Sequence, residues 1–560
     1  MWLSIVMSIV CSPAFASTNP DEFIADQLRE KAVASRNFAN PVTFVVTGVA
    51  NGIGDSVVSE LHNQPFAAAL GESRGAWQSC LSPSDPECDV TKSGRSGKPG
   101  TFDLSGTSVL PVCTADQEEN CIESFEIAYG NEKFTKAKFL RQLESEYLVK
   151  PDPATDYPGG STVALWSDAS LENSKSLSYV TNVNYAVLLN SSNKFQITSI
   201  SFVVKAYEEI SGNYRAPFFD YASRNVNNKS FRNTKLAWTE NGRAGLHKQF
   251  PEDSKFRLKV RANSGISGWY QGRIKNPNIN IEKFSNRNNI ISIEGEPVKV
   301  PTFAYTKEAT ELSPQEYRWQ QNNGGMGSLT DGSGFIALAN SDQPDTFDYL
   351  DNFRALAADK VAGYYTMWAV HSTTWGNSNS CLQDTTRILG VVSTNAMAYN
   401  GYSPRFENGE INYQVAGMHY ESDGINLVEG TYDLLLRSDA ARCLYGFSSA
   451  PVQASISITG EQSQKIATTT MTESNGWMKL SAYGFNFSSP TIRVKLSQVE
   501  AEQQVTEDTK DKSQATPSVT TAVTSQAGTA TKKSITCTKG KVTKKVVAAK
   551  PKCPRGFKKS

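Results

Sequence analysis

Histidine is scarce in this chain of 560 residues, which holds only four: His62, His247, His371 and His419. No two of them are spaced as metal ligands, and no C-x-x-C pair is present. Zinc sites in proteins are built from closely spaced cysteines and histidines. The sequence therefore predicts no metal site, and no cofactor.

Long apolar runs are missing after residue 16. A membrane-spanning helix needs ~18 or more such residues, so we expect no integral membrane segment. Residues 2–10 are nearly all apolar, and Ala14–Ala16 is a small-x-small cleavage pattern. This predicts a secretory signal peptide over residues 1–16 and a secreted or cell-surface protein. No Lys or Arg precedes the apolar part, which suggests a translation start further upstream; lipidation of Cys11 is a weaker alternative.

Eight cysteines follow the signal peptide, and an even number in an oxidising compartment is typical of disulfides. They fall into local couples: Cys80 with Cys88, Cys113 with Cys121, Cys381 with Cys443, and Cys537 with Cys553. Pairing among the first four stays open, and free buried thiols are the alternative.

Acidic residues are absent from residues 531–560, which hold eleven Lys and Arg. The first 530 residues carry 45 basic against 56 acidic residues, so a net charge of zero hides an acidic body and a basic tail. Such asymmetry indicates an anionic partner. Outside a cell we expect cell-wall polymers or the envelope surface rather than nucleic acid, and a merely solubilising tail is the alternative. The candidate binding residues are Lys539, Lys541, Lys544, Lys545, Lys550, Lys552, Arg555, Lys558 and Lys559.

Short alternating segments dominate the body. In "TNVNYAVLLN", Val183, Tyr185, Val187 and Leu189 alternate with their neighbours, and "FQITSISFVV" follows a polar turn, which predicts a β-hairpin. Similar runs are "FRLKVRA", "IISIEGEPVKV", "RILGVVS", "VQASISI", "WMKLSAYGFNF" and "TIRVKLSQ". Many short strands with polar turns favour a mainly β fold of one or more β-sandwich domains, stabilised by disulfides.

One helix is expected before this pattern and one within it. Residues 19–37 begin with an Asn-Pro cap, and residues 344–361 carry apolar side chains at helical spacing. Aspartates crowd the start of the second helix. We interpret them as a capped, solvated helix start rather than as a calcium-binding site. We expect this organisation: signal peptide (1–16), N-terminal helix and cysteine-loop region (17–155), β-rich domain (156–300), β-rich domain with an inserted helix (301–498), disordered linker (499–533), and basic disulfide-closed tail (534–560).

Three enzyme motifs lack their context. The turn Thr47-Gly48-x-x-x-Gly52-x-Gly54 matches short-chain dehydrogenases, but no repeated strand–helix units follow it. "GESRG" at Gly71–Gly75 fits a nucleophile elbow around Ser73, without the surrounding α/β pattern. "GDS" at Gly54–Ser56 lacks a D-x-x-H partner. A serine hydrolase remains an alternative function, and a dehydrogenase is disfavoured.

Two aromatic clusters are candidates for stacking on sugars: Trp269 with Tyr270, and Trp368 with Trp375. Such rings more often fill the core between two sheets. Sugar stacking requires exposed rings and core packing requires buried ones, so the exposure of the rings distinguishes the two interpretations.

The tail "ITCTKGKVTKKVVAAKPKCPRGFKK" resembles a cysteine–lysine cassette at the C-termini of exported actinobacterial proteins. "GWYQGRIKNPNINI", "FENGEINYQVAGMHY", "GTYDLLLRSDAARCLYGF" and "GWMKLSAYGFNFSSPTIRVKLSQ" look like a family of long, uncharacterised secreted actinobacterial cell-surface proteins. The resemblance covers roughly residues 20–500 and the tail, and it implies no activity or catalytic residue.

Together these observations predict an exported, envelope-associated protein that is not an enzyme. It would be a surface or binding protein retained by its basic tail. The alternatives are a carbohydrate-binding or adhesive module and a secreted serine hydrolase.

Overall fold

The structure is a computed structural model, and it describes the following residues: 43–49, 66–70, 76–80, 104–143, 151–168, 177–189, 192, 194–212, 219–220, 225–226, 236–263, 268–308, 314, 333–337, 347, 350, 354, 357–361, 363–373, 379–384, 387–400, 403–448, 452–459, 468–487, 491–498, 533–539, 542–548 and 558–559. The predicted N-terminal helix (19–37), the signal peptide and the linker lie outside them.

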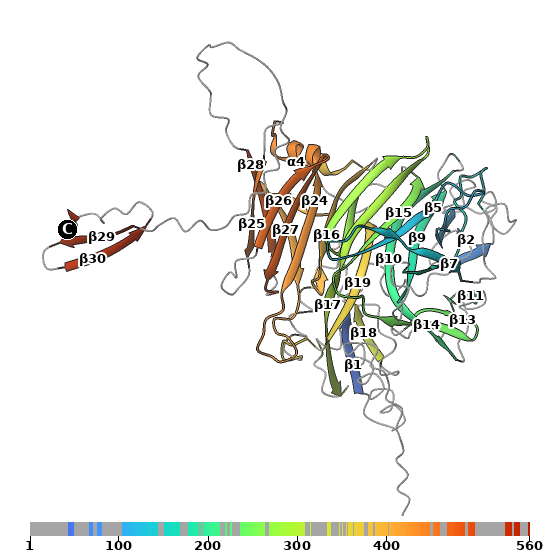
Figure 1. Cartoon of the computed structure of the whole chain (residues 1–560), viewed down its shortest axis with the longest axis horizontal. Helices are drawn as coiled ribbons and strands as arrows, with labels where there is room; N and C mark the ends of the chain where they lie inside the picture. Colours follow the sequence, from blue (N-terminus) through green and yellow to red (C-terminus); the bar gives the residue numbers. More distant parts are fainter. Residues whose placement is uncertain are drawn as a thin grey trace, which may run out of the picture.

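The described chain is mainly β, as predicted (Figure 1). In chain order its elements are β1 (Thr43–Val49), β2 (Phe66–Leu70), β3 (Ala76–Cys80), β4 (Leu104–Val109), β5 (Cys121–Tyr129), β6 (Thr135–Lys136), β7 (Lys138–Gln142), β8 (Ala164–Ser167), β9 (Ser178–Leu189), β10 (Phe195–Ser211), β11 (Phe219–Asp220), β12 (Asn225–Val226), β13 (Leu236–Glu240), β14 (Arg243–Lys248), β15 (Ser254–Asn263), β16 (Gly268–Lys283), β17 (Asn288–Glu308), β18 (Ser333–Ala337), β19 (Gly363–Thr373), η4 (Ser380–Leu382), β20 (Ile388–Thr394), β21 (Ala398–Tyr399), β22 (Arg405–Glu407), β23 (Glu410–Ala416), β24 (Gly430–Arg437), α4 (Ser438–Tyr445), β25 (Val452–Thr459), β26 (Thr468–Ser474), β27 (Trp477–Phe485), β28 (Thr491–Gln498), β29 (Lys533–Lys539), β30 (Val542–Ala548) and β31 (Lys558–Lys559).

One continuous sheet, the middle sheet, runs through the body. The predicted hairpin is confirmed as β9 and β10, which pair antiparallel. Next to β10 lie β19 and then β16. The N-terminal part of β16 pairs in parallel with β20, which continues the sheet into β24, β27 and β26. Residues far apart in the chain are therefore hydrogen-bonded neighbours.

A first covering sheet packs on one face of the middle sheet. It consists of β5, β15, β17 and the C-terminal part of β16, all antiparallel. Aromatic rings join the two layers: Phe125 and Phe256 on the covering sheet lie 5.8 and 5.4 Å from the ring centroid of Tyr179 on β9. Each such ring buries a large apolar area in the core of a β-sandwich.

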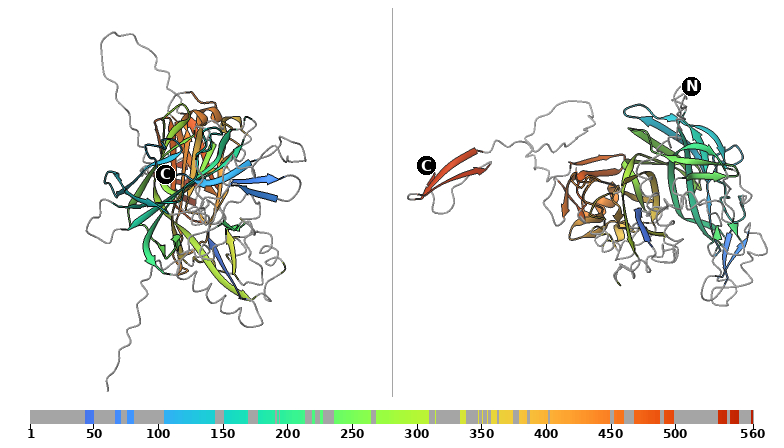
Figure 2. Two further views of the ribbon diagram at one scale, coloured as in Figure 1. Left: turned by 90° about the vertical axis from the view of Figure 1, so that its right-hand side faces the viewer. Right: turned by 90° about the horizontal axis from the view of Figure 1, so that it is seen from below.

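A second covering sheet packs on the opposite face, over β20, β24 and β27. It consists of β21, β23, β28 and β25, with β22 beside β23. Tyr432, Leu434 and Leu436 of β24 point into this core. Leu435, between them, belongs to the first core instead. The period-2 alternation of β24 thus serves two sandwiches, which Figure 2 shows side by side.

A buried arginine connects the two sandwiches. Arg273, on β16, is fully buried, and its Nη1 donates to the carbonyl oxygen of Thr394 at 3.1 Å and to that of Ala396. Its guanidinium carbon lies 4.5 Å from the ring centroid of Tyr399. Carbonyl acceptors and an aromatic ring lower the cost of burying a charge, so β16 holds the segment after β20 in a defined position.

Two predicted boundaries do not match these sheets. Residue 300 falls inside β17, and β19 returns to pair between β10 and β16, so the sheets do not divide there. Within the predicted cysteine-loop region (17–155), residues 121–129 form β5, which pairs with β15. The apolar residues of β5 are interleaved with Ser and Glu on the outer face of the sheet.

The predicted inserted helix is described only in part. Phe347, Leu350 and Arg354 are helical, and a turn occupies residues 357–359. Arg354 donates twice to the carbonyl oxygen of Gly417, at 2.9 and 2.7 Å, which holds this helical segment against the second sandwich. The short helix α4 follows β24 directly and was not predicted.

The structure contains two of the predicted disulfides. Cys113 and Cys121 close a short loop before β5, and Cys381 on η4 joins Cys443 on α4. The side chains of Cys80, Cys88, Cys537 and Cys553 lie outside the described residues. In the tail, β29 pairs antiparallel with β30 and β31 in a sheet of their own. Among the described helices, none is long and apolar enough to cross a membrane.

The two disulfides should differ in their contribution to stability. They join residues 62 and 8 positions apart. Restricting the unfolded chain predicts a loss of about 4 kcal/mol for Cys381→Ala with Cys443→Ala, and about 2.5 kcal/mol for Cys113→Ala with Cys121→Ala. Urea unfolding of both double variants under non-reducing conditions measures this. An equal or larger loss from the short loop would contradict the chain-entropy explanation.

Candidate functional site: a polar cleft at the edge of β16

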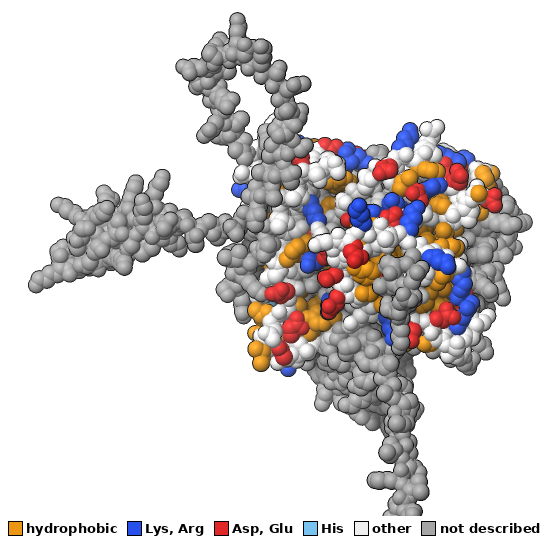
Figure 3. Space-filling view, in the orientation of Figure 1, with side chains coloured by type: hydrophobic (Ala, Val, Ile, Leu, Met, Phe, Trp, Pro, Cys, Tyr) orange, Lys and Arg blue, Asp and Glu red, His pale blue; other side chains and the backbone are white. Residues whose placement is uncertain are grey.

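A cleft of about 640 Å³ opens where the first covering sheet meets the hairpin of β26 and β27. We call it the polar cleft. Amides, hydroxyls and charged groups predominate in its lining, which comprises Glu123, Arg257, Lys259, Asn276, Pro277, Asn278, Ile279, Asn280, Glu282, Ile290, Ser292, Glu294, Leu435, Thr472, Ser474, Asn475, Trp477 and Lys479. Figure 3 shows acidic and basic side chains interspersed on the face of the molecule seen in Figure 1.

The floor of the cleft follows from strand alternation. On β15, Phe256, Leu258 and Val260 are buried, while Arg257 and Lys259 lie on the outer face. On β16, Ile279 is buried and Asn278 and Asn280 on either side of it are exposed. Successive residues of a strand point to opposite faces. One covering sheet therefore supplies both an apolar core and a polar outer surface.

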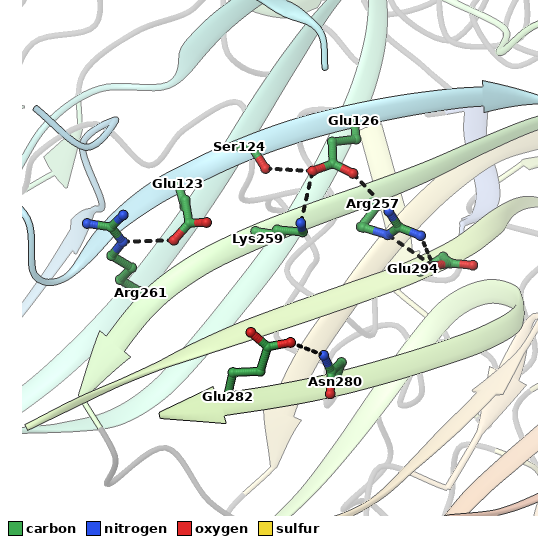
Figure 4. Close-up of polar contacts among 9 residues, drawn as sticks. All are labelled: Glu123, Ser124, Glu126, Arg257, Lys259, Arg261, Asn280, Glu282 and Glu294. Atoms are coloured by element: carbon green, nitrogen blue, oxygen red, sulfur yellow. Dashed lines mark hydrogen bonds and ion pairs between the residues drawn. The ribbon is translucent and has the colours of Figure 1, made fainter. Parts of the chain in front are cut away.

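A ladder of ion pairs fixes this surface (Figure 4). Glu126 of β5, almost fully buried, accepts from Arg257 at 2.9 Å and from Ser124 at 3.0 Å, and its carboxylate lies 3.1 Å from the ammonium of Lys259. Arg257 also donates to Glu294 at 2.8 Å. These ion pairs already fix the long side chains before a ligand binds. The side chains therefore lose little further conformational entropy on binding, and the floor of the cleft is preorganised.

Opposing effects act on Glu126. Burial by itself raises the pKa of this carboxyl group, but the hydrogen bonds from Arg257, Lys259 and Ser124 outweigh it, and the pKa of Glu126 is lowered. The carboxylate is therefore ionised at neutral pH. It keeps the two basic side chains in place along β15 rather than acting as an acid.

The opposite wall is the hairpin of β26 and β27. It turns through Asn475 and Gly476, both at positive φ, as a two-residue Asn-Gly turn requires. Trp477 follows the turn at once. Its ring is half-buried against the first core, and the guanidinium of Arg437 lies 5.6 Å from its centroid. The cleft thus has one aromatic side chain among hydrogen-bonding groups.

A second hollow, of about 820 Å³, lies near the loop between β23 and β24. Lys275, Lys299 and the exposed side chain of Ile425 contribute to it, and the hydroxyl of Tyr364 donates to Glu421 there at 2.5 Å. It has no ladder comparable to that of the polar cleft. The cleft is therefore the better-built site.

The sugar-stacking prediction is wrong for three of its four residues. Trp269, Tyr270 and Trp368 are buried in the sheets, so no ring face is open to a sugar. Trp269 faces the second core, and Tyr270 and Trp368 face the first, because β16 and β19 lie inside the middle sheet and are covered on both faces. Trp375 lies outside the described residues. The signal for the polar cleft was nevertheless present, as asparagine at every second position in "NPNIN" and as "NGW".

The histidines do not form an open catalytic site in the part of the chain that is described. Ser201 and His371 hydrogen-bond to each other across the paired strands β10 and β19, where Ser201 is buried. Burial lowers the pKa of His371 to about 4, so it is neutral. Asp359 accepts from the backbone N–H of His419 at 3.0 Å and contacts its imidazole. Ser73, Ser56 and His62 lie outside the described residues.

The tail residues are described only by their backbone. Lys539, Lys544, Lys545, Lys558 and Lys559 lie in or at the ends of β29, β30 and β31. The other predicted binding residues, Lys541, Lys550, Lys552 and Arg555, lie outside the described residues, as do the aspartates at 342, 345, 348 and 351. Within the described chain, no three His, Cys, Asp or Glu residues are grouped as metal ligands.

No protein-family model matches this chain, and no curated protein matches it.

The ladder predicts a specific loss of stability. Arg257→Met keeps the apolar stem but leaves Glu126 buried with fewer donors, which should cost about 1–3 kcal/mol in the free energy of unfolding. The pKa of Glu126 in the folded state is lower than its ordinary value of 4.5. The contribution of this carboxylate to the free energy of unfolding is therefore fully present above pH 4.5 and is lost as the pH falls through the folded-state pKa. Urea unfolding at pH 7 and at successively lower pH measures both effects.

Lys255→Met is the matched control on the same face of β15. Lys255 lies 4.0 Å from the carboxylate of Glu296, in a half-exposed pair. Such pairs contribute about 0.2–1 kcal/mol. A loss at Lys255 as large as that at Arg257 would show that the ladder has no special role.

Proposed function

We propose that this protein is an exported, envelope-associated binding protein whose polar cleft binds a polyhydroxyl ligand such as a glycan. The basic tail would retain it at an anionic surface. The observation that carries the proposal is the lining of the cleft, in which asparagine amides and serine and threonine hydroxyls accompany balanced charges and one tryptophan ring.

The chemistry of the lining favours a neutral ligand. Its basic residues, Arg257, Lys259 and Lys479, are matched by three acidic ones, Glu123, Glu282 and Glu294. No excess charge remains to attract an ion. Neutral amides donate and accept hydrogen bonds, as sugar hydroxyls require, and Trp477 offers an aromatic ring against the less polar face of a sugar.

Export is supported by the disulfides. Such bonds persist in oxidising compartments, and Cys113–Cys121 and Cys381–Cys443 both lie at disulfide geometry. The tail sheet brings its lysines together along the backbone pairing, with Cys537 opposite Lys544 and Lys559. Each lysine near an anionic surface contributes on the order of 1 kcal/mol.

A secreted serine hydrolase is the other candidate. Ser73→Ala tests it directly, on ester and glycoside panels. Activity that survives this change would exclude Ser73 as the nucleophile.

Binding in the cleft should depend on Trp477. We expect the full chain to bind members of a glycan array, and Trp477→Ala to weaken the affinity for the best ligand about tenfold or more, since about 1.4 kcal/mol corresponds to tenfold. Asn280→Ala should weaken it less. Isothermal titration calorimetry measures both.

Tyr420→Ala is the control, because Tyr420 is a partly exposed aromatic residue outside the cleft. It should bind like the wild type. Unchanged affinity in Trp477→Ala, with an unchanged melting temperature, would place the binding site elsewhere, and an array without any bound glycan would remove the proposed ligand class.

Retention by the tail should depend on charge. Replacing Lys539, Lys541, Lys544 and Lys545 by Gln should release the protein from intact cells at lower salt than the wild type. The wild type should itself be released near 1 M salt, where the Debye length is about 3 Å. Immunoblots of the washes measure this.

The control replaces four exposed lysines of the body, Lys133, Lys136, Lys138 and Lys495, by Gln. This variant should be washed off at the same salt concentration as the wild type. Wild-type protein that stays on the cells after a high-salt wash argues against electrostatic retention.

A further inference from the structure

One lysine and one asparagine meet where the two sandwiches join. Lys479, on β27, donates from Nζ to Oδ1 of Asn276, on β16. The two residues are 203 positions apart in the sequence. The first lies in the hairpin wall of the polar cleft, and the second lies in the edge strand of its floor. Their contact therefore bridges the first covering sheet and the middle sheet.

The amide of Asn276 is held on several sides. Asn276 has a left-handed backbone, with φ of 56°, at a bulge where the pairing of β16 with β17 shifts register. Its backbone N–H donates to Oδ2 of Asp433 at 3.0 Å. Its Nδ2 donates to Oε1 of Glu296 at 3.4 Å. The side-chain carbonyl thus points to Lys479 while the amide nitrogen points away.

Asp433 is the buried group that positions this bulge. It lies on β24, opposite Ser481 of β27, and it accepts from Ser481 at 2.5 Å and from the hydroxyl of Tyr483 at 2.7 Å. Because side chains alternate along β27, Lys479 shares a face with Ser481 and Tyr483. Burial raises the pKa of Asp433 despite these hydrogen bonds.

Lys479 is placed to act as a nucleophile. Burial lowers its pKa, although the carboxylates of Asp433, Glu296 and Glu294 act in the opposite direction. A lowered pKa increases the fraction of the free amine, which is the nucleophilic form of lysine. Lys275 is another ammonium nearby, and its Nζ lies 4.9 Å from the ring centroid of Tyr483.

We propose that Lys479 and Asn276 form an intramolecular isopeptide bond that covalently joins the two sandwiches. The neutral amine of Lys479 attacks Cγ of Asn276, and a new bond forms between Nζ and Cγ. The bond between Cγ and Nδ2 breaks. The departing nitrogen takes a proton from the attacking one and leaves as ammonia. No oxidant or external reactant is needed.

The residue after Asn276 excludes the main side reaction by which an asparagine loses ammonia. An asparagine can also lose ammonia when the backbone nitrogen of the next residue attacks its side chain. Here the next residue is Pro277, whose backbone nitrogen carries no hydrogen. The bond would close a loop of 203 residues, which restricts the unfolded chain as a disulfide does. This inference goes beyond the proposed function and does not depend on any ligand of the cleft.

Mass spectrometry of the full chain, reduced and alkylated, tests the bond. The reference is the mass calculated from the sequence, starting at the first residue that the purified chain carries. We expect the measured mass to lie about 17 Da below it, which is the mass of one ammonia. Proteolysis should yield one branched product that contains Lys479 and Asn276. An unshifted mass, with the two peptides recovered separately, overturns the proposal whether or not any variant folds.

Variants assign the shift to this pair. Lys479→Arg should restore the full mass and slow the migration of the reduced chain on a denaturing gel, since the closed loop is opened. Lys259→Arg is the matched control, as Lys259 lines the same cleft but pairs with Glu126. It should keep the shift of about 17 Da. A shift that persists in Lys479→Arg also overturns the proposal.

Discussion

The burial of Arg273 is the constraint on which the arrangement of the body depends. A guanidinium taken out of water is costly unless its donors are matched, and here backbone carbonyls after β20 accept from it. It lies on β16, the strand shared by the middle sheet and the first covering sheet. The path of one strand therefore determines how the second sandwich continues from the first.

The polar cleft is a consequence of the same strand. After Arg273, β16 leaves β19 and pairs with β17, and the bulge at Asn276 marks the change. The C-terminal part of β16 then becomes the edge of the covering sheet, beside the hairpin of β27. A strand edge next to a sheet face leaves a gap that polar side chains line. The carboxylate of Asp433 secures the bulge through its backbone N–H.

Much of the strand content was predictable from local pattern. The alternation of Val183, Tyr185 and Val187 identifies β9, because a half-buried strand must place every second residue inward. The couple of Cys381 and Cys443, predicted as a disulfide from the sequence, is confirmed. The pattern failed at β5, where Glu126 is a charged residue at a nearly buried position. Its burial is offset by Arg257 and Lys259 of β15, more than 130 positions away in the sequence, and by the neighbouring Ser124.

The sequence by itself determined the mainly β character, the acidic body and the basic tail, since alternation and charge are local properties of the chain. Only the tertiary structure decided the rest. Trp269 and Trp368 became core, and Trp477 became part of a cleft, because exposure depends on which sheet covers a strand. Likewise Lys479 and Asn276 are far apart in the chain, and no local rule brings them together. The parallel pairing of β16 with β20 brings them together. It places β16, which carries Asn276, and β27, which carries Lys479, in adjoining layers.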